Sequence, residues 1–128
     1  MKNILFVCVE NSCRSQMAEA FANMDGQEFI KSYSAGSHPS GSVNKKAVTS
    51  MREVGYDLAV HESKGLDEIP EIEYDLVVTM GCGDECPNVR ARRRLSWDIP
   101  DPKKMNKKDF AKVRDTIRKK VREMIESV

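Results

Sequence analysis

The residues best suited to chemistry form one short string near the N-terminus, CVENSCRS at positions 8–15. Cys8 ends an apolar run, and Arg14 and Ser15 open a stretch with helical spacing. A five-residue loop between a cysteine and an arginine can curl so that its N–H groups face one centre, while the helix adds its positive end. Such a loop can hold a tetrahedral oxyanion and stabilise a thiolate. The string therefore predicts that Cys8 is a nucleophile that attacks a bound oxyanion.

Individual positions of this loop have expected roles. Arg14 should grip two substrate oxygens with its planar guanidinium group, and Ser15 should donate a hydrogen bond to the Cys8 sulfur. Asn11 tolerates a left-handed backbone and can brace the loop. Cys13 need not face the anion, so we interpret it as a packing residue. The expected substrate-binding loop consists of Val9, Glu10, Asn11, Ser12, Cys13 and Arg14.

The remaining cysteines, Cys82 and Cys86, have three residues between them, which is not the C-x-x-C spacing of a zinc knuckle or a thioredoxin-type motif. A strand-like run begins almost at Met1 without a basic leader, so we expect a cytoplasmic protein whose thiols stay reduced. The cysteines are then catalytic, redox-active or metal-binding. A zinc site built from all four is one alternative; otherwise we expect no metal and no cofactor.

The composition indicates an ordinary globular chain. Its 128 residues, 40% hydrophobic and 32% charged, predict a single domain over residues 1–128, which we expect to be a monomer. No apolar run approaches the roughly 20 residues of a membrane span, so we expect no membrane contact. Residues 87–128 hold 14 of the 21 Lys and Arg residues, but only Trp97 and Phe110 interleave with them. We therefore expect no nucleic-acid partner.

The elements that must position the loop alternate between strand and helix patterns. Apolar runs predict strands over residues 3–8, 28–36, 75–80 and 93–99. Helical spacing predicts helices over 17–24, opened by residues 14–16 and stopped at Asp25-Gly26, over the stripe from Val43 to Val54, and from an Asn106 cap to Ile125. This order predicts an α/β fold: a single doubly wound, four-stranded parallel sheet flanked by helices. The ligand should lie at the carboxyl ends of the strands, next to Cys8 and Cys82.

Four segments, NSCRSQMAEA (11–20), YSAGS (33–37), DLVVT (75–79) and Asp101-Pro102, occur in this order over nearly the whole chain. They resemble segments of the low-molecular-weight protein tyrosine phosphatase family, and within it of the thioredoxin-coupled arsenate reductases. The resemblance implies arsenate, or a similar oxyanion such as phosphate or sulfate, as the ligand. It also implies that Asp101 is the general acid, which protonates the leaving oxygen as Cys8 attacks.

The same resemblance implies a relay of thiols. Cys82 would attack the cysteinyl arsenic adduct and expel arsenite, and Cys86 would then attack Cys82, leaving a disulfide for thioredoxin to reduce. A phosphatase, which would use water to hydrolyse a cysteinyl phosphate, is the alternative. A further alternative is a non-catalytic module that binds phosphate or zinc. We favour the reductase because a redox relay needs the extra thiols and dephosphorylation does not.

The sequence departs from the family pattern in the spacing of the later cysteines, in the loop and after Asp101-Pro102. Only three residues separate Cys82 from Cys86, so an intact helix there would have to unwind before a disulfide could form. Glu10 stands where the family more often has glycine, and it adds negative charge at the mouth of an anion site. Lys103 and Lys104 follow Asp101-Pro102, where the family's phosphatases tend to carry aromatic residues that flank an aryl substrate.

Some family members hold potassium near the loop through an Asn, a Glu, a Ser and an Asp. The first three correspond to Asn11, Glu19 and Ser34, but Lys64 stands in place of the Asp. The Lys64 ammonium could pair with Glu19, take the position of the ion and support the loop. The alternative is that Lys64 points into water, as most lysines do.

Overall fold

The computed structural model describes residues 1–81 and 89–128, so the expected thiols of Cys82 and Cys86 lie outside the described residues. The elements, in chain order, are β1 (Lys2–Cys8), α1 (Arg14–Gly26), β2 (Ile30–Gly36), α2 (Lys45–Arg52), the short 3-10 helices η1 (Leu58–Val60) and η2 (Leu66–Glu68), β3 (Tyr74–Met80), β4 (Ala91–Trp97) and α3 (Lys107–Ser127). Among the described residues, no helix combines the length and apolar character needed to cross a membrane.

The four strands form one sheet in the order β2-β1-β3-β4, and every neighbouring pair is parallel. The predicted four-stranded parallel sheet flanked by helices is therefore confirmed. β1 lies inside the sheet, which explains its uninterrupted apolar run. In the register of the sheet Cys8 pairs with Gly36 of β2, and Val7 pairs with Thr79 of β3. The end of β1 thus lies between the ends of two other strands.

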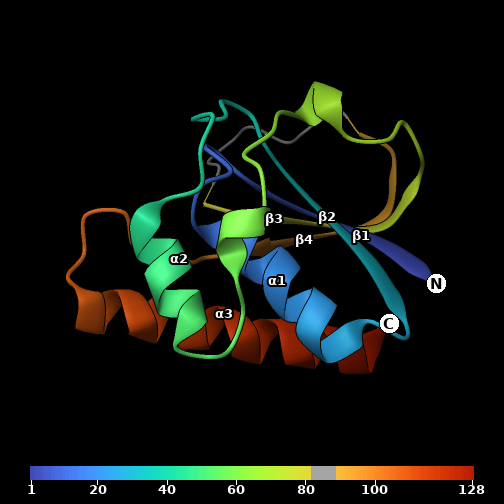
Figure 1. The fold of residues 1–128 in the computed structure, drawn as a ribbon. Helices are drawn as coiled ribbons and strands as arrows, with labels where there is room; N and C mark the ends of the chain where they lie inside the picture. The colour runs from blue at the N-terminus through green and yellow to red at the C-terminus, as the bar shows by residue number, and fades with distance from the viewer. Residues whose placement is uncertain (82–88) are drawn as a thin grey trace.

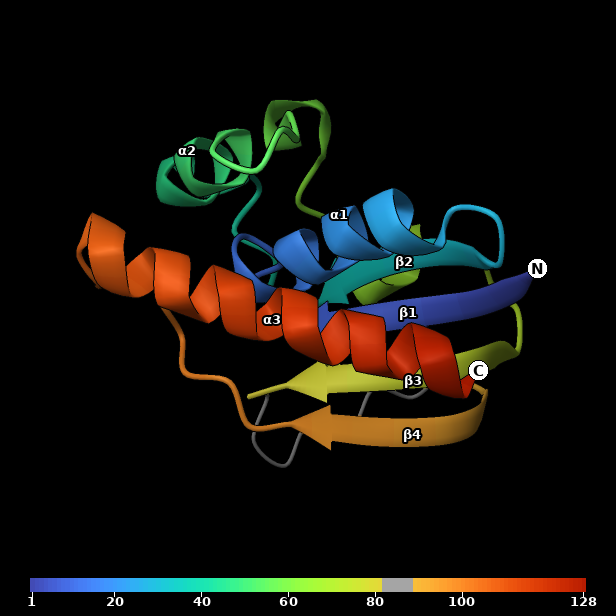
Figure 2. The same cartoon turned by 90° about the horizontal axis from the view of Figure 1, so that it is seen from below.

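Within residues 1–81 and 89–128, helices α1, α2 and α3 are not divided between the two faces of the sheet (Figures 1 and 2). Helices α1 and α3 pack against each other on one face, and α2 packs against α3 near the carboxyl ends of the strands (Figure 2). The 3-10 helix η2 lies on the opposite side of the sheet, near β2 (Figure 1). The segment 37–44, which leads into α2, lies next to the loop that follows the carboxyl end of β1.

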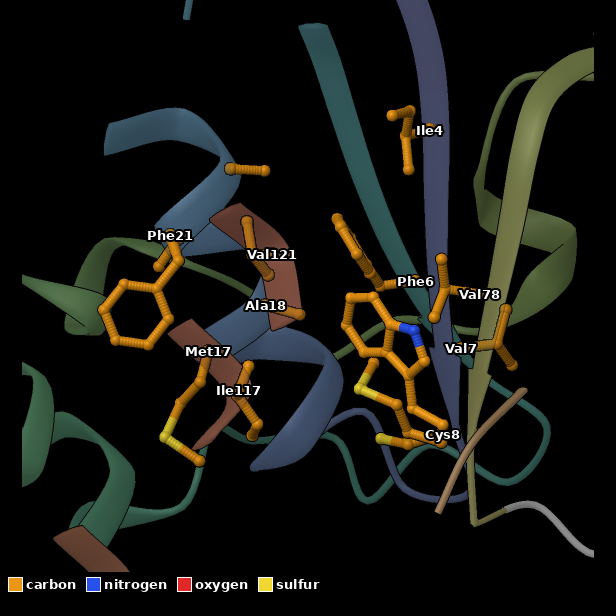
Figure 3. Close-up of a cluster of buried hydrophobic side chains, with 14 of the residues drawn as sticks. Ile4, Phe6, Val7, Cys8, Met17, Ala18, Phe21, Val78, Ile117 and Val121 are labelled. Atoms are coloured by element: carbon orange, nitrogen blue, oxygen red, sulfur yellow. The ribbon is translucent and has the colours of Figure 1, made fainter. Parts of the chain in front are cut away.

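The main core lies between the sheet and helices α1 and α3. Ile4, Phe6 and Cys8 point from β1 toward the helices, because alternate residues of a strand share one face (Figure 3). The helices contribute buried apolar side chains, among them Met17, Ala18, Phe21, Ile117 and Val121. This packing places Cys8 at the end of a rigid strand, with its sulfur on the α1 side.

Several predicted boundaries shift for identifiable reasons. Helix α1 continues through Asp25-Gly26 because Arg118 and Arg122 of α3 bind the Asp25 carboxylate and hold its last turn. Helix α2 begins only at Lys45, since the Asn44 side chain accepts a 2.8 Å hydrogen bond from Lys46 N and caps it there. Strand β4 starts at residue 91 rather than 93, and Asn106 caps α3 as predicted.

Candidate active site

The carbonyl groups of the loop between β1 and α1 point to the outside of the loop, where they accept hydrogen bonds. The segment 37–44 donates backbone hydrogen bonds to the carbonyl oxygens of Cys8, Val9, Glu10 and Ser12, at 3.3, 2.8, 3.0 and 3.0 Å respectively. In a trans peptide the next N–H points opposite to the carbonyl, so the N–H groups of residues 9, 10, 11 and 13 turn to the inside. The loop thus has the inward N–H groups of the predicted anion site.

Two backbone features allow this tight loop. Asn11 has a φ of 50°, the left-handed conformation expected from its residue type. Gly36, at the end of β2, lies so close that a Cβ atom on it would come within 2.6 Å of Val9 O. Gly36 was not among the site residues expected from the sequence. Its signal was a glycine ending the strand that pairs with the strand of Cys8.

Ser15 is oriented toward the Cys8 sulfur. Its Oγ lies 2.9 Å from Cys8 Sγ and accepts a 2.8 Å hydrogen bond from Asn11 Nδ2. Because the amide already supplies a hydrogen to this oxygen, the single hydroxyl hydrogen of Ser15 is directed to the sulfur. The arrangement stabilises a Cys8 thiolate, and Cys8 itself is only 2% exposed. The side chains of Cys8, Asn11 and Ser15 thus come together as the sequence predicts.

Asn11 is held in turn by Gln16, whose role the sequence analysis missed. Asn11 Oδ1 accepts hydrogen bonds of 2.8 Å from both Gln16 Nε2 and Lys64 N. Gln16 Oε1 lies 2.9 Å from His61 Nδ1. Since Gln16 donates through its nitrogen, its oxygen must accept, so Nδ1 of His61 carries the hydrogen. Gln16 follows Ser15 in the first turn of α1, but its partner lies 45 residues away, and no local pattern marks that contact.

His61 completes a chain of hydrogen bonds that run in one direction. With the hydrogen on Nδ1, Nε2 accepts from the Tyr56 hydroxyl at 2.6 Å. Burial lowers the pKa of His61 below its ordinary 6.5 and Lys64 adds to this effect, while Glu19 opposes it. His61 is therefore neutral near pH 7. Hydrogens point from Tyr56 through His61, Gln16 and Asn11 to Ser15, and from there to the Cys8 sulfur.

Arg14 links the loop to the segment that carries Asp101. Its Nη1 donates a 3.0 Å hydrogen bond to Ile99 O, and its Nη2 lies 3.9 Å from Asp101 Oδ2. Asp101 Oδ1 accepts from Lys103 N at 3.1 Å, which fixes the carboxylate beside the arginine. Gly81 has a φ of 67° and lies against Arg14 Nη1, where a Cβ atom would overlap the guanidinium group. Gly81 is a second glycine at a strand end that the sequence analysis did not identify.

Glu10 and Lys103, two of the positions that depart from the family pattern, form an ion pair. Lys103 Nζ lies 2.9 and 3.0 Å from the two carboxylate oxygens of Glu10. This hydrogen-bonded carboxylate raises the pKa of Lys103, so the ammonium stays charged throughout the neutral range. The negative charge that Glu10 brings to the mouth of the anion site is therefore paired.

The second cysteine of the loop lies away from solvent. Cys13 is 3% exposed, and its sulfur accepts a 3.8 Å hydrogen bond from Ser12 Oγ. Burial raises the pKa of the Cys13 thiol to about 12, so this group stays protonated at neutral pH. The geometry fits the packing role expected for Cys13 and leaves Cys8 as the loop thiol that contacts Ser15.

The cluster behind the loop centres on Glu19. Its Oε1 accepts a 2.5 Å hydrogen bond from Ser34 Oγ and lies 3.9 Å from Lys64 Nζ. Asn11 Oδ1 already accepts from two N–H donors, and Glu19 Oε1 is occupied by the Ser34 hydroxyl and faces the Lys64 ammonium. The side chains present therefore do not fit a potassium ion.

A metal centre has no donor set in the part of the chain that the structure describes. Within residues 1–81 and 89–128, no three His, Cys, Asp or Glu side chains lie close enough together to hold an ion. The zinc alternative needs Cys82 and Cys86, which lie outside the described residues. The described geometry instead offers an anion site with a thiol at its base.

Comparisons with known proteins agree with this geometry. The sequence model of the family described as low molecular weight phosphotyrosine protein phosphatase matches residues 3–128. The chain is 38% identical to Arsenate reductase 1 of Staphylococcus haemolyticus (strain JCSC1435), over 99% of this chain and 97% of that protein. It is 34% identical to the glutaredoxin arsenate reductase of Synechocystis sp. (strain ATCC 27184 / PCC 6803 / Kazusa), over 100% of this chain and 99% of that protein.

Solved structures show the same similarity. An arsenate reductase in the phosphate binding state superimposes with a TM-score of 0.91 at 34% identity, covering 100% of this chain and 99% of that one. The similarity therefore extends over the whole fold, including the loop, the strand ends and the segment of Asp101.

Proposed function

Since the chain belongs to the low molecular weight phosphotyrosine protein phosphatase family, we propose that it reduces arsenate to arsenite through a covalent adduct on Cys8. The observation that carries the proposal is the orientation of the Ser15 hydroxyl toward the Cys8 sulfur, at the base of a loop whose N–H groups turn inward. The two relatives and the solved structure described above are arsenate reductases.

In the first step the Cys8 thiolate attacks arsenic(V) in arsenate. A sulfur–arsenic bond forms and one arsenic–oxygen bond breaks, and Asp101 protonates the oxygen so that it leaves as water. The loop N–H groups and the guanidinium of Arg14 hold the remaining oxygens. Asp101 lies beside Arg14, at 3.9 Å, which suits a proton donor next to the bound anion.

In the second step the Cys82 thiolate attacks the Cys8 sulfur. A Cys8–Cys82 disulfide forms, and the electron pair of the sulfur–arsenic bond passes to arsenic, which leaves as arsenite in the +3 state. Cys86 then attacks Cys82 and releases Cys8 as a thiolate, a leaving group that Ser15 stabilises. Gly81, the residue before Cys82 in the chain, lies against Arg14, which supports Cys82 as the second thiol.

The third step returns the Cys82–Cys86 disulfide to two thiols at the expense of an external dithiol. We propose thioredoxin as this reductant, on the resemblance of the chain to thioredoxin-coupled enzymes. The Synechocystis relative carries glutaredoxin in its name, so glutaredoxin is the second reductant to be compared. Either protein supplies two electrons for each arsenate reduced.

The test is arsenate-dependent oxidation of NADPH by the purified protein with thioredoxin and thioredoxin reductase, repeated with glutaredoxin, glutathione and glutathione reductase. We expect Cys8→Ser and Cys82→Ser to release no arsenite. Cys86→Ser should release one arsenite per protein and then stop as a Cys8–Cys82 disulfide, which mass spectrometry of the intact protein can detect. Substantial turnover by Cys8→Ser would overturn the proposal. Normal cycling by Cys86→Ser would remove Cys86 from the relay.

A further inference from the structure

We propose that the ion pair between Glu10 and Lys103 restricts the anion site to inorganic oxyanions and hinders esters of phosphate. The inference deepens the proposed function and rests on it, because it names the class of substrate that the same site accepts. Arsenate and phosphate would enter freely, whereas an anion that carries an aryl or alkyl group would be disfavoured.

The pair joins two segments whose backbones are both held in place. On the loop side, Glu10 O accepts hydrogen bonds from Ser40 N at 3.0 Å and from Ser63 Oγ at 3.1 Å. On the other side, Lys103 O accepts a 3.2 Å hydrogen bond from Lys46 Nζ of α2. The side chains of Glu10 and Lys103 therefore reach toward each other from anchored ends, 93 residues apart in the chain.

The ion pair between Glu10 and Lys103 lies near Asp101, the proton donor to the leaving oxygen. Asp101 can protonate the leaving oxygen only if that oxygen lies beside its carboxylate. Lys103 follows two residues later, and its own N–H is bonded to Asp101 Oδ1 at 3.1 Å. In arsenate the oxygen carries nothing larger than a hydrogen. In an ester it carries a carbon group, which would extend toward Lys103 and its bond to Glu10, because the Lys103 backbone is bonded to Asp101.

Charge acts together with this steric effect. An unpaired Glu10 in the anion loop would repel every oxyanion, and Lys103 offsets that repulsion. The side chains of Glu10 and Lys103 are 30% and 47% exposed, so water and salt screen the bond and it can open. The pair should therefore lower ester binding several-fold rather than abolish it.

The test compares the affinities of the reduced full-length protein for inorganic phosphate and for phenylphosphonate, in which an aryl group replaces one oxygen, by calorimetric titration. In the unaltered protein phosphate should bind more tightly by about tenfold. In the Glu10→Gln/Lys103→Met double variant, which removes both charges together, this ratio should fall at least about threefold. The exchange variant Glu10→Lys/Lys103→Glu restores an ion pair and should restore the ratio.

Single variants separate the effect of the charges of Glu10 and Lys103 from the steric effect of their ion pair. Lys103→Met leaves Glu10 unpaired and should weaken phosphate binding, whereas Glu10→Gln should strengthen it. Lys104→Met removes the neighbouring exposed lysine and should leave the ratio unchanged. Because Lys103 and Lys104 are both exposed, neither single change should prevent folding, and thermal unfolding of each variant checks this.

An unchanged ratio in the double variant would overturn this inference, whatever the reductase assay shows. A protein that fails to reduce arsenate, yet shows the expected change of ratio, would refute the proposed reductase and leave the selectivity of the anion site established. Absence of phosphate binding to the unaltered protein would contradict both.

Discussion

Asn11 and Ser15 are joined by a 2.8 Å hydrogen bond in which the Asn11 amide donates, and this bond decides where the Ser15 hydroxyl hydrogen points. The hydrogen is left for Cys8 Sγ, 2.9 Å away. A hydrogen bond to a charged group contributes about 1.5–3 kcal/mol, which corresponds to roughly tenfold to a hundredfold in rate. The loop therefore controls the reactivity of the cysteine through a side chain that does not touch the sulfur.

We expect Ser15→Ala to slow arsenite release by about tenfold or more, since an H-bond to a thiolate is lost. The same variant should slow the alkylation of Cys8 by iodoacetamide, as followed by mass spectrometry of the Cys8 peptide. Ser12→Ala is the matched control, because the Ser12 hydroxyl bonds Cys13 and not Cys8. An alkylation rate that Ser15→Ala leaves unchanged would contradict the assigned hydrogen bond.

Gly81→Ala should weaken phosphate binding by about tenfold, because a methyl group at this position overlaps Arg14 Nη1 and forces the guanidinium group to move. The control is Gly55→Ala: Gly55 also has a positive φ, of 86°, but nothing lies within 4 Å of its Cβ position. Both variants carry the strain of the left-handed conformation, and only Gly81→Ala disturbs the arginine. Equal loss of phosphate affinity in the two variants would show that strain alone is responsible.

Potassium should stabilise this protein no more than sodium does at equal ionic strength, since the Lys64 ammonium lies 3.9 Å from Glu19 Oε1 where a cation would have to bind. Thermal unfolding in the two chloride salts checks this. Lys64→Met should lower the melting temperature by a few degrees, because the partly buried Glu19 loses its cationic partner. A clear stabilisation of the unaltered protein by potassium would contradict the prediction that the Lys64 ammonium takes the position of the ion.

Asp25 should make the stability of the protein depend on pH in the acid range. Burial works to raise its pKa, but the hydrogen bonds and charges of Arg118 and Arg122 outweigh burial and lower the pKa below the ordinary 3.8. The carboxylate is thus favoured in the folded state, so its contribution is fully present above pH 3.8 and is lost as the pH falls through the lowered pKa.

Asp25→Asn should accordingly cost about 1 kcal/mol of the free energy of unfolding at pH 7, a modest value because water reaches part of the pair. The difference from the unaltered protein should shrink in acid, as urea unfolding at several pH values can show. The control is Glu126→Gln, which removes an exposed carboxylate four residues after Arg122 in α3. This variant should have little effect on the free energy of unfolding. A loss of stability for Asp25→Asn that stays constant into strong acid would rule out the charge effect.

The sequence was most informative where neighbouring residues decide the outcome. The unbroken apolar run of β1, the helical stripe of α3 and the cap at Asn106 depend on contacts within a few residues, so their spacing predicts them. The anion loop belongs to this group, because a strand end, a short loop and a helix N-terminus are adjacent in the chain. For the same reason the left-handed conformation of Asn11 was predictable from its residue type.

Contacts between residues far apart in the chain could not be predicted from local sequence patterns. Glu10 and Lys103 are 93 residues apart, and each by itself reads as an exposed charge that departs from a family pattern. Their bond exists because the end of β1 and the segment after β4 meet at the same edge of a parallel sheet. The contact of Gly81 with Arg14 has the same origin, in the strand order β2-β1-β3-β4.

The residue types and their local spacing thus determined the strands, the helices and the loop that holds Cys8, because those features arise from interactions between near neighbours in the chain. Only the tertiary structure decided that α1 and α3 share one face of the sheet, that Gln16 and His61 support the loop, and that Glu10 is paired. These features depend on register and crossover geometry, which bring together residues that no local pattern connects.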